Sequence, residues 1–178
     1  TGAAGAGSQA RTETCRRASA SGTGGAIAAE PMGTEAEVTG GSGAARAAVG
    51  PGASMPVQRR TAVLFTWRPM LLARMDEIAT LVSTELGKNL EEARGVVINV
   101  IEACETAVAA PMLMKGESLM NVSRGHDTVS YKEPLGVFAG IAPFNFPAMI
   151  PFGWMVPLCI VTGNTMVLKP AEFPTLSA

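Results

Sequence analysis

The chain has 178 residues, of which 47% are hydrophobic and 16% charged, and its formal net charge is −1. A charge this close to zero argues against a nucleic-acid partner and against attraction to an anionic membrane surface. The length allows one sizeable domain or parts of two. Because the first residue is Thr1 rather than Met, and the chain is unusually apolar, we expect part of a longer protein.

Residues 1–54 are rich in Gly, Ala, Ser and Thr and have almost no large apolar side chain. Such a stretch buries little surface, so we expect a disordered or poorly packed head, with order beginning near Pro56. Cys15, Cys104 and Cys159 lie far apart, which indicates a reducing compartment. We expect the cytoplasm, with the mitochondrial matrix as an alternative because the head has a faintly transit-peptide-like composition.

Two amphipathic helices are predicted after the head. Leu64, Trp67, Leu71, Ile78 and Leu81 recur at helical spacing, which predicts a helix that ends near Gly87 and is kinked by Pro69. A second helix should begin at Asn89, with Glu92 placed as in a capping box, and should end before Pro111. Its apolar stripe is Leu90, Ala93, Val97, Val100, Cys104 and Val108.

The last third of the chain predicts an α/β arrangement. After a loop region that contains Gly116 and Gly125, residues 128–132 predict a short, half-exposed strand. Residues 135–143 and 165–169 predict buried strands, and a helix between them should have Pro147 in its first turn and end near Val161. A strand, a helix and a strand of this length form a βαβ unit with parallel strands.

The segment from Pro134 to Leu168 has no charged residue, so a membrane span is an alternative interpretation. Four prolines and several glycines interrupt it. A lipid-exposed helix with four prolines would leave backbone groups without hydrogen bonds. The pattern therefore favours a buried βαβ unit over a membrane anchor.

Residues 134–172 read PLGVFAGIAPFNFPAMIPFGWMVPLCIVTGNTMVLKPAE, and shorter runs upstream read QRRTAVLF, ELGKNLEEARG and LMKGESL. These motifs resemble the aldehyde dehydrogenases, and AGIAPFNFPAMIP is most similar to their CoA-acylating methylmalonate-semialdehyde branch. The resemblance covers residues 55–178. It implies N-terminal helices followed by the first βαβ unit of an incomplete Rossmann-like NAD-binding domain, with an oligomerisation strand near 128–132. It also implies a homo-oligomer, commonly a tetramer.

The resemblance implies an enzyme that oxidises malonate or methylmalonate semialdehyde through a cysteine thioester. NAD would take the hydride, and CoA would accept the acyl group. The family's nucleophilic cysteine and general-base glutamate would lie beyond Ala178, so we expect the chain alone to be inactive. A generic aldehyde dehydrogenase that hydrolyses its thioester, using NAD or NADP, is the alternative.

Six site residues follow from the resemblance. Asn145 is expected to stabilise an oxyanion, Ala142 and Phe144 to line the cofactor path, and Lys169 and Glu172 to bind the nucleotide ribose or phosphates. Phe173 occupies a further cofactor position, but an Arg often stands there in the family, which puts a charge contact in doubt. The spacing alone favours structural roles, in which Asn145 ties a strand end to a helix start and Lys169 and Glu172 form a solvated pair.

No other residue predicts a catalytic or metal site. Cys104 and Cys159 lie in apolar stretches and read as small buried hydrophobic residues, and Cys15 lies in the head. The single histidine, His126, has no companion with which to form a metal site or a Ser/His couple. None of the three cysteines is therefore expected to be a nucleophile.

Overall fold

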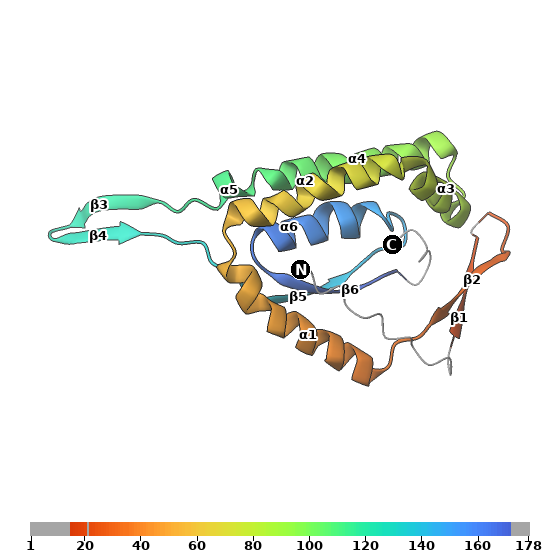
Figure 1. The fold of residues 1–178 in the computed structure, drawn as a ribbon, viewed down its shortest axis with the longest axis horizontal. Helices are drawn as coiled ribbons and strands as arrows, with labels where there is room; N and C mark the ends of the chain where they lie inside the picture. The colour runs from red at the N-terminus through yellow and green to blue at the C-terminus, as the bar shows by residue number, and fades with distance from the viewer. Residues whose placement is uncertain (1–14, 21, 172–178) are drawn as a thin grey trace.

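The structure is a computed structural model that describes residues 15–20 and 22–171. It consists of helices, a parallel strand pair and two hairpins (Figure 1). The elements in chain order are β1 (Cys15–Ser19), β2 (Ala26–Pro31), α1 (Glu35–Ser54), α2 (Val57–Ala73), α3 (Met75–Leu86), α4 (Leu90–Val108), α5 (Ala110–Leu113), β3 (Ser118–Ser123), β4 (His126–Val129), β5 (Val137–Ile141), the π-helical η1 (Ile150–Met155), α6 (Val156–Val161) and β6 (Thr165–Lys169).

The elements form layers around the β5–β6 pair. Helix α1 lies on one side of the pair, while η1 and α6 lie on the other, beneath α2 and α4 (Figure 1). The Thr165 hydroxyl donates to the carbonyl of Ala45 at 2.9 Å, which joins β6 to α1. The main core lies where α3, α4 and the segment around Met149 meet. This core supports the loop that follows β5.

Secondary structure begins earlier than the sequence predicts, because β1, β2 and α1 precede Pro56. A capping box starts α1: the Thr34 hydroxyl accepts from the Glu37 N–H at 3.3 Å, and the Glu37 carboxylate accepts from the Thr34 N–H at 2.8 Å. All of α1 is described, and none of its residues is buried. The sequence pattern did not predict this helix, because α1 has few large apolar residues and packs through small side chains. The division at residue 54 itself stays a prediction.

The break in the first predicted helix lies at Arg74, five residues after Pro69. Pro69 is exposed inside α2, where its missing N–H removes one hydrogen bond on the solvent side. At Arg74 the backbone has φ −111° and ψ 16°, and α3 begins with the next residue. Gly87 then ends α3 in the left-handed conformation with φ 71°, which glycine adopts readily.

The second predicted helix is confirmed as α4, with Asn89 as its N-cap. The Asn89 side chain accepts from the Glu92 N–H at 2.8 Å. Most of the predicted stripe is buried, but Leu90 is 40% exposed and Val108 is half-buried. The buried residues of α4 are Ala93, Val96, Val97, Val100, Ile101, Cys104 and Ala107.

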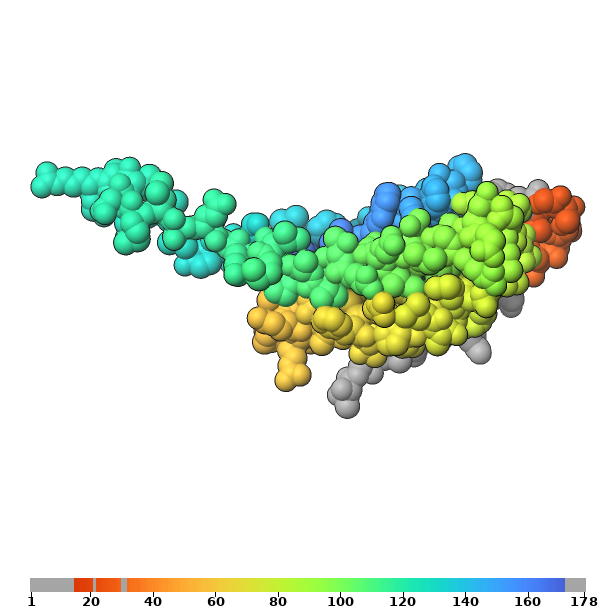
Figure 2. Space-filling view, turned by 90° about the horizontal axis from the view of Figure 1, so that it is seen from above, coloured from red at the N-terminus to blue at the C-terminus, as the bar shows by residue number. Residues whose placement is uncertain are grey.

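The region around Gly116 and Gly125 was expected to be a loop, which is correct for the two glycines themselves but wrong for the residues between them. It contains β3, which pairs antiparallel with β4 in a hairpin that projects away from the rest of the chain (Figures 1 and 2). The strand predicted at 128–132 overlaps β4 only at residues 128–129. Every residue of the two strands is exposed, so no alternation of apolar and polar residues marked β3 in the sequence.

The predicted βαβ unit is confirmed. Strands β5 and β6 are parallel, in a register that pairs Val137 with Thr165 and Ile141 with Lys169. The connecting helix starts later than predicted, since Pro147 lies in a turn and η1 begins at Ile150. Among the described residues, no helix has both the length and the apolar character needed to cross a membrane.

Candidate functional site

The carboxyl ends of β5 and β6 form the edge at which the predicted site residues gather. The N–H of Ala142, directly after β5, donates to the carbonyl of Lys169 at 3.0 Å. Ala142 is buried, whereas the Lys169 side chain is exposed at the end of β6. Nucleotides bind at this edge in open parallel sheets. The two predicted cofactor residues are thus adjacent at an edge suited to a nucleotide.

Phe144 and Asn145 lie in the bend that follows this edge. Phe144 is 67% exposed, and Asn145 is also exposed. Within residues 15–20 and 22–171, the structure records no hydrogen bond from the Asn145 side-chain amide, and so no tie to the neighbouring strand or helix. An amide carries two N–H donors, so this side chain is able to donate to the oxygen of a bound molecule.

Lys88 contacts this bend, although no sequence signal assigned it to the site. Its ammonium donates to the backbone carbonyl of Asn145 at 3.4 Å and lies 4.4 Å from the ring centroid of Phe146. Lys88 belongs to the link between α3 and α4, 57 positions before Asn145. The run ELGKNLEEARG drew attention to this link, but a contact across that separation depends on the tertiary fold.

Glu172 and Phe173 lie outside the described residues. Their roles at the cofactor therefore stay predictions from the resemblance. Lys169, the last residue of β6, is only three positions before Glu172. The structure thus brings together Ala142, Phe144, Asn145 and Lys169 at and just beyond one sheet edge.

Two of the cysteines are poor nucleophiles in this structure. Cys104 is 1% exposed, and burial, with a smaller contribution from the charge of Glu105, raises the pKa of its thiol to about 11. Burial also raises the pKa of Cys159. A thiol must lose its proton to attack a carbonyl, so neither is suited to that role. Cys15 is exposed at the start of β1.

The described part of the chain contains no group of three or more His, Cys, Asp or Glu side chains placed to hold a metal ion. His126 lies at the start of β4 on the exposed hairpin. One of its ring nitrogens lies 3.0 Å from the carbonyl oxygen of Arg124. These observations leave the edge of β5 and β6 as the candidate site.

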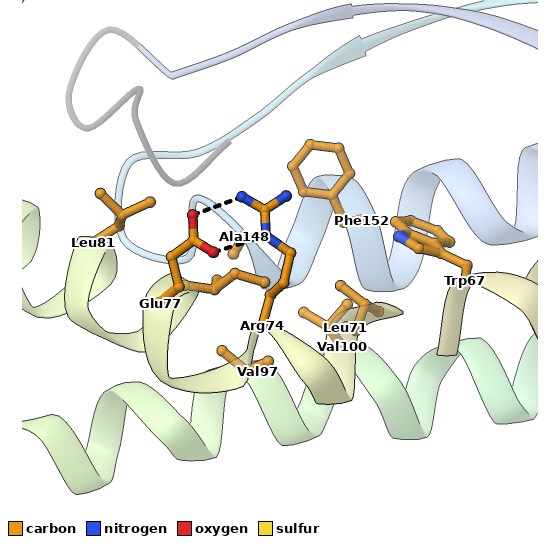
Figure 3. Close-up of a pocket in the computed structure, with 10 residues that line it drawn as sticks. Trp67, Leu71, Arg74, Glu77, Leu81, Val97, Val100, Ala148 and Phe152 are labelled. Carbon is orange, nitrogen blue, oxygen red and sulfur yellow. Dashed lines mark hydrogen bonds and ion pairs between the residues drawn. The ribbon is translucent and has the colours of Figure 1, made fainter. Parts of the chain in front are cut away.

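A separate hollow of about 280 Å³ opens between α2, α3, α4 and the helix that follows Asn145 (Figure 3). Trp67 and Phe152 meet edge to face there, with ring centroids 6.1 Å apart. Arg74 and Glu77 pair beside the hollow through two hydrogen bonds of 2.8 and 2.6 Å. Its lining includes none of the six predicted site residues, so we assign it no part in the candidate site.

The parallel β5–β6 pair, with helices on both sides, is an α/β arrangement of the nucleotide-binding type, and comparison with known proteins specifies the family. A family model described as the aldehyde dehydrogenase family matches residues 8–178. The chain therefore belongs to the aldehyde dehydrogenase family, which confirms the resemblance and extends it upstream of residue 55.

Curated relatives of this chain include malonate-semialdehyde dehydrogenases. The protein from Bacillus pumilus (strain SAFR-032) is 44% identical over 157 residues, which are 88% of this chain and 32% of that protein. A relative from Listeria monocytogenes serotype 4a (strain HCC23) is 42% identical over 150 residues, 84% of this chain and 30% of its own length. The chain thus spans about a third of the length of these relatives.

Solved structures agree with this assignment. Methylmalonate-semialdehyde dehydrogenase from Oceanimonas doudoroffii matches with a TM-score of 0.88 and 37% identity, over 93% of this chain and 34% of that one. A putative methylmalonate-semialdehyde dehydrogenase from Sinorhizobium meliloti 1021, complexed with NAD, matches with a TM-score of 0.85 and 33% identity over 91% and 33%. The expected α/β fold is confirmed.

Proposed function

We propose that this chain forms the first part of an NAD-dependent enzyme that converts malonate or methylmalonate semialdehyde to an acyl-CoA. The observation that carries the proposal is the 44% identity to a malonate-semialdehyde dehydrogenase over 88% of the chain. The site geometry agrees, because the Asn145 amide, which has no hydrogen-bond partner among the described residues, lies next to a nucleotide-type edge. The parts of the site that would supply a nucleophilic cysteine and a general-base glutamate are expected beyond residue 178.

The residues at the β5–β6 edge fit NAD. Ala142 adds only a small, buried side chain to the edge, and Phe144, two residues further on, offers an exposed apolar face. Lys169 presents a cation from which a ribose hydroxyl or a phosphate is able to accept. Glu172 would accept from the adenosine-ribose hydroxyls, and Phe173 would lie next to it without a charge. Bound there, NAD would supply the hydride acceptor.

Asn145 is proposed to stabilise the oxyanion of the substrate. When a cysteine thiolate adds to the aldehyde carbon, the carbonyl oxygen becomes an alkoxide, and the Asn145 amide would donate to it. Loss of hydride from the same carbon leaves a thioester. Attack by the CoA thiolate then forms a second oxyanion at that carbon and releases the cysteine. One well-placed donor of this kind is worth roughly 3 kcal/mol in the transition state.

The hairpin of β3 and β4 is proposed to mediate homo-oligomerisation, and the family resemblance implies a tetramer. Leu119, Met120 and Val122 are 60%, 67% and 51% exposed on strand β3. An apolar strand that projects from its own chain gains stability when a second chain covers it. We place the enzyme in the cytoplasm, with the mitochondrial matrix as the alternative.

A hybrid enzyme tests the proposed reaction. It joins residues 1–178 of this chain to the part of the Bacillus pumilus relative that follows the matched segment. We expect NADH formation from malonate semialdehyde to require CoA and to yield an acyl-CoA. Equal steady-state rates without CoA, with the free acid as product, would assign the chain to the hydrolytic dehydrogenases. The chain of 178 residues alone is expected to form no NADH.

A further inference from the structure

Lys88 extends from a backbone that is fixed on both sides. The Gly87 N–H donates to the Ser83 carbonyl at 2.8 Å, which closes the end of α3. The Ser83 hydroxyl donates to the carbonyl of Lys88 itself at 2.7 Å. Asn89 then caps α4 through the bond from Glu92. The Lys88 side chain therefore starts from a defined place, and its ammonium reaches the bend after β5 without a mobile linker.

The ammonium makes two contacts with consecutive residues of that bend. It donates to the Asn145 carbonyl at 3.4 Å, and it lies 4.4 Å from the Phe146 ring centroid, within the range of a cation–π interaction. The Phe146 ring also packs against the main core. Lys88 thus binds the carbonyl of the peptide group between Asn145 and Phe146. It also contacts the Phe146 ring, which packs this peptide against the core.

These two Lys88 contacts constrain the backbone that carries the Asn145 side-chain amide. Among the described residues no hydrogen bond holds that amide, so its position depends on the backbone that carries it. A shift of the Asn145 backbone away from Lys88 would move the side-chain amide and lengthen the Lys88 hydrogen bond at the same time. A misplacement of about 1 Å in a reacting group costs on the order of a hundredfold in rate.

We propose that Lys88 is a positioning residue. It holds the side-chain amide of Asn145 in place before the oxyanion forms. The inference rests on the proposed role of Asn145. Lys88 acts through Asn145 and is not itself a catalytic residue. A lysine that only stabilised the α3–α4 link would affect the stability of the chain without acting through Asn145.

Hydrogen exchange on the 178-residue chain tests whether Lys88 holds this bend, without any activity measurement. We expect Lys88→Met to raise the exchange rate of the Ile150 amide, which donates to the Phe146 carbonyl at 3.2 Å, at least tenfold, while α4 keeps its protection. Lys88→Arg should restore protection, because a guanidinium also donates to a carbonyl and stacks on a ring. Lys115→Met, at an exposed lysine before β3, is the matched control and should change nothing in this bend. Unchanged exchange in Lys88→Met would overturn the proposal.

Kinetics of the hybrid enzyme test whether Lys88 affects the rate through Asn145. Lys88→Met should lower kcat at least tenfold with the KM for NAD unchanged, and Lys88→Arg should recover most of it. In the Asn145→Ala background, Lys88→Met should have almost no further effect, because coupled residues are not additive. Additive losses would overturn the proposal. A normal rate for Asn145→Ala would instead refute the proposed function, while the exchange experiment would still decide whether Lys88 holds the bend.

Discussion

The side-chain oxygen of Asn164 accepts a hydrogen bond from the backbone N–H of Gly136 at 2.8 Å. The N–H of Thr165 donates to the Gly136 carbonyl at 3.0 Å. Gly136 is buried just before β5. Its backbone N–H and its carbonyl are therefore both hydrogen-bonded to residues at the start of β6. This tie lies at the opposite end of the strand pair from Ala142 and Lys169, so it sets the register of the two strands without touching the candidate site.

Asn164→Ala is expected to lower the free energy of unfolding by about 1–2 kcal/mol. The substitution leaves the buried Gly136 N–H without its acceptor, and an unsatisfied buried donor costs about that much. Chemical denaturation of the 178-residue chain measures the change. Asn164→Asp keeps an oxygen acceptor and should lose less, so an equal loss in both variants would point away from this hydrogen bond.

Gly163→Ala should destabilise the chain by about 2 kcal/mol or more. Gly163 has φ 85°, a conformation that costs about 1–3 kcal/mol for a side-chain-bearing residue. A Cβ there would also lie 2.9 Å from Cγ of Pro134 and collide with the buried guanidinium of Arg60. The matched control is Gly50→Ala, because Gly50 lies in α1 with open space around it. Thermal melting should show that the control is neutral or stabilised.

The parts of the fold that could be predicted from sequence are those whose own residues bury an apolar face. The β6 strand has the predicted bounds, and α4 begins at its predicted cap, because Asn89 and the apolar spacing after it act locally. The hairpin of β3 and β4 has no buried face, so its residues carry no such periodic signal. Helix α1 relies on small residues against β6, which composition alone reads as disorder.

The candidate site was predictable only in part for a similar reason. Asn145 and Lys169 lie in one continuous motif, and the parallel pairing of β5 with β6 follows from the βαβ pattern. Lys88 acts across 57 positions, and its contact depends on how the α3–α4 link packs beside the bend. Periodicity and motif spacing describe a chain locally, so they do not reveal such a partner.

The stability of the chain should fall between pH 9 and 11 because of Cys104. Burial raises the pKa of this thiol from 9.0 to about 11. In that range the unfolded thiol loses its proton while the folded thiol keeps it, so ionisation favours the unfolded state. The stability that is fully present below pH 9 is lost as pH rises, by up to about 2 kcal/mol. Cys104→Ala should have a shallower pH dependence of unfolding over this interval, and equal slopes would contradict the assignment.

The hybrid enzyme should prefer NAD to NADP at least tenfold in kcat/KM. Glu172 follows β6 closely, and the family resemblance places its carboxylate at the adenosine-ribose hydroxyls. A 2′-phosphate there would meet like-charge repulsion in addition to losing a hydrogen bond, and both effects act on cofactor binding. Glu172→Gln removes the negative charge and keeps an acceptor oxygen, so the preference should narrow mainly through a lower KM for NADP. Glu133→Gln makes the same charge change at an exposed residue before β5 and should leave the preference unaltered. Equal kcat/KM for the two cofactors in the unsubstituted hybrid would remove Glu172 from the cofactor site.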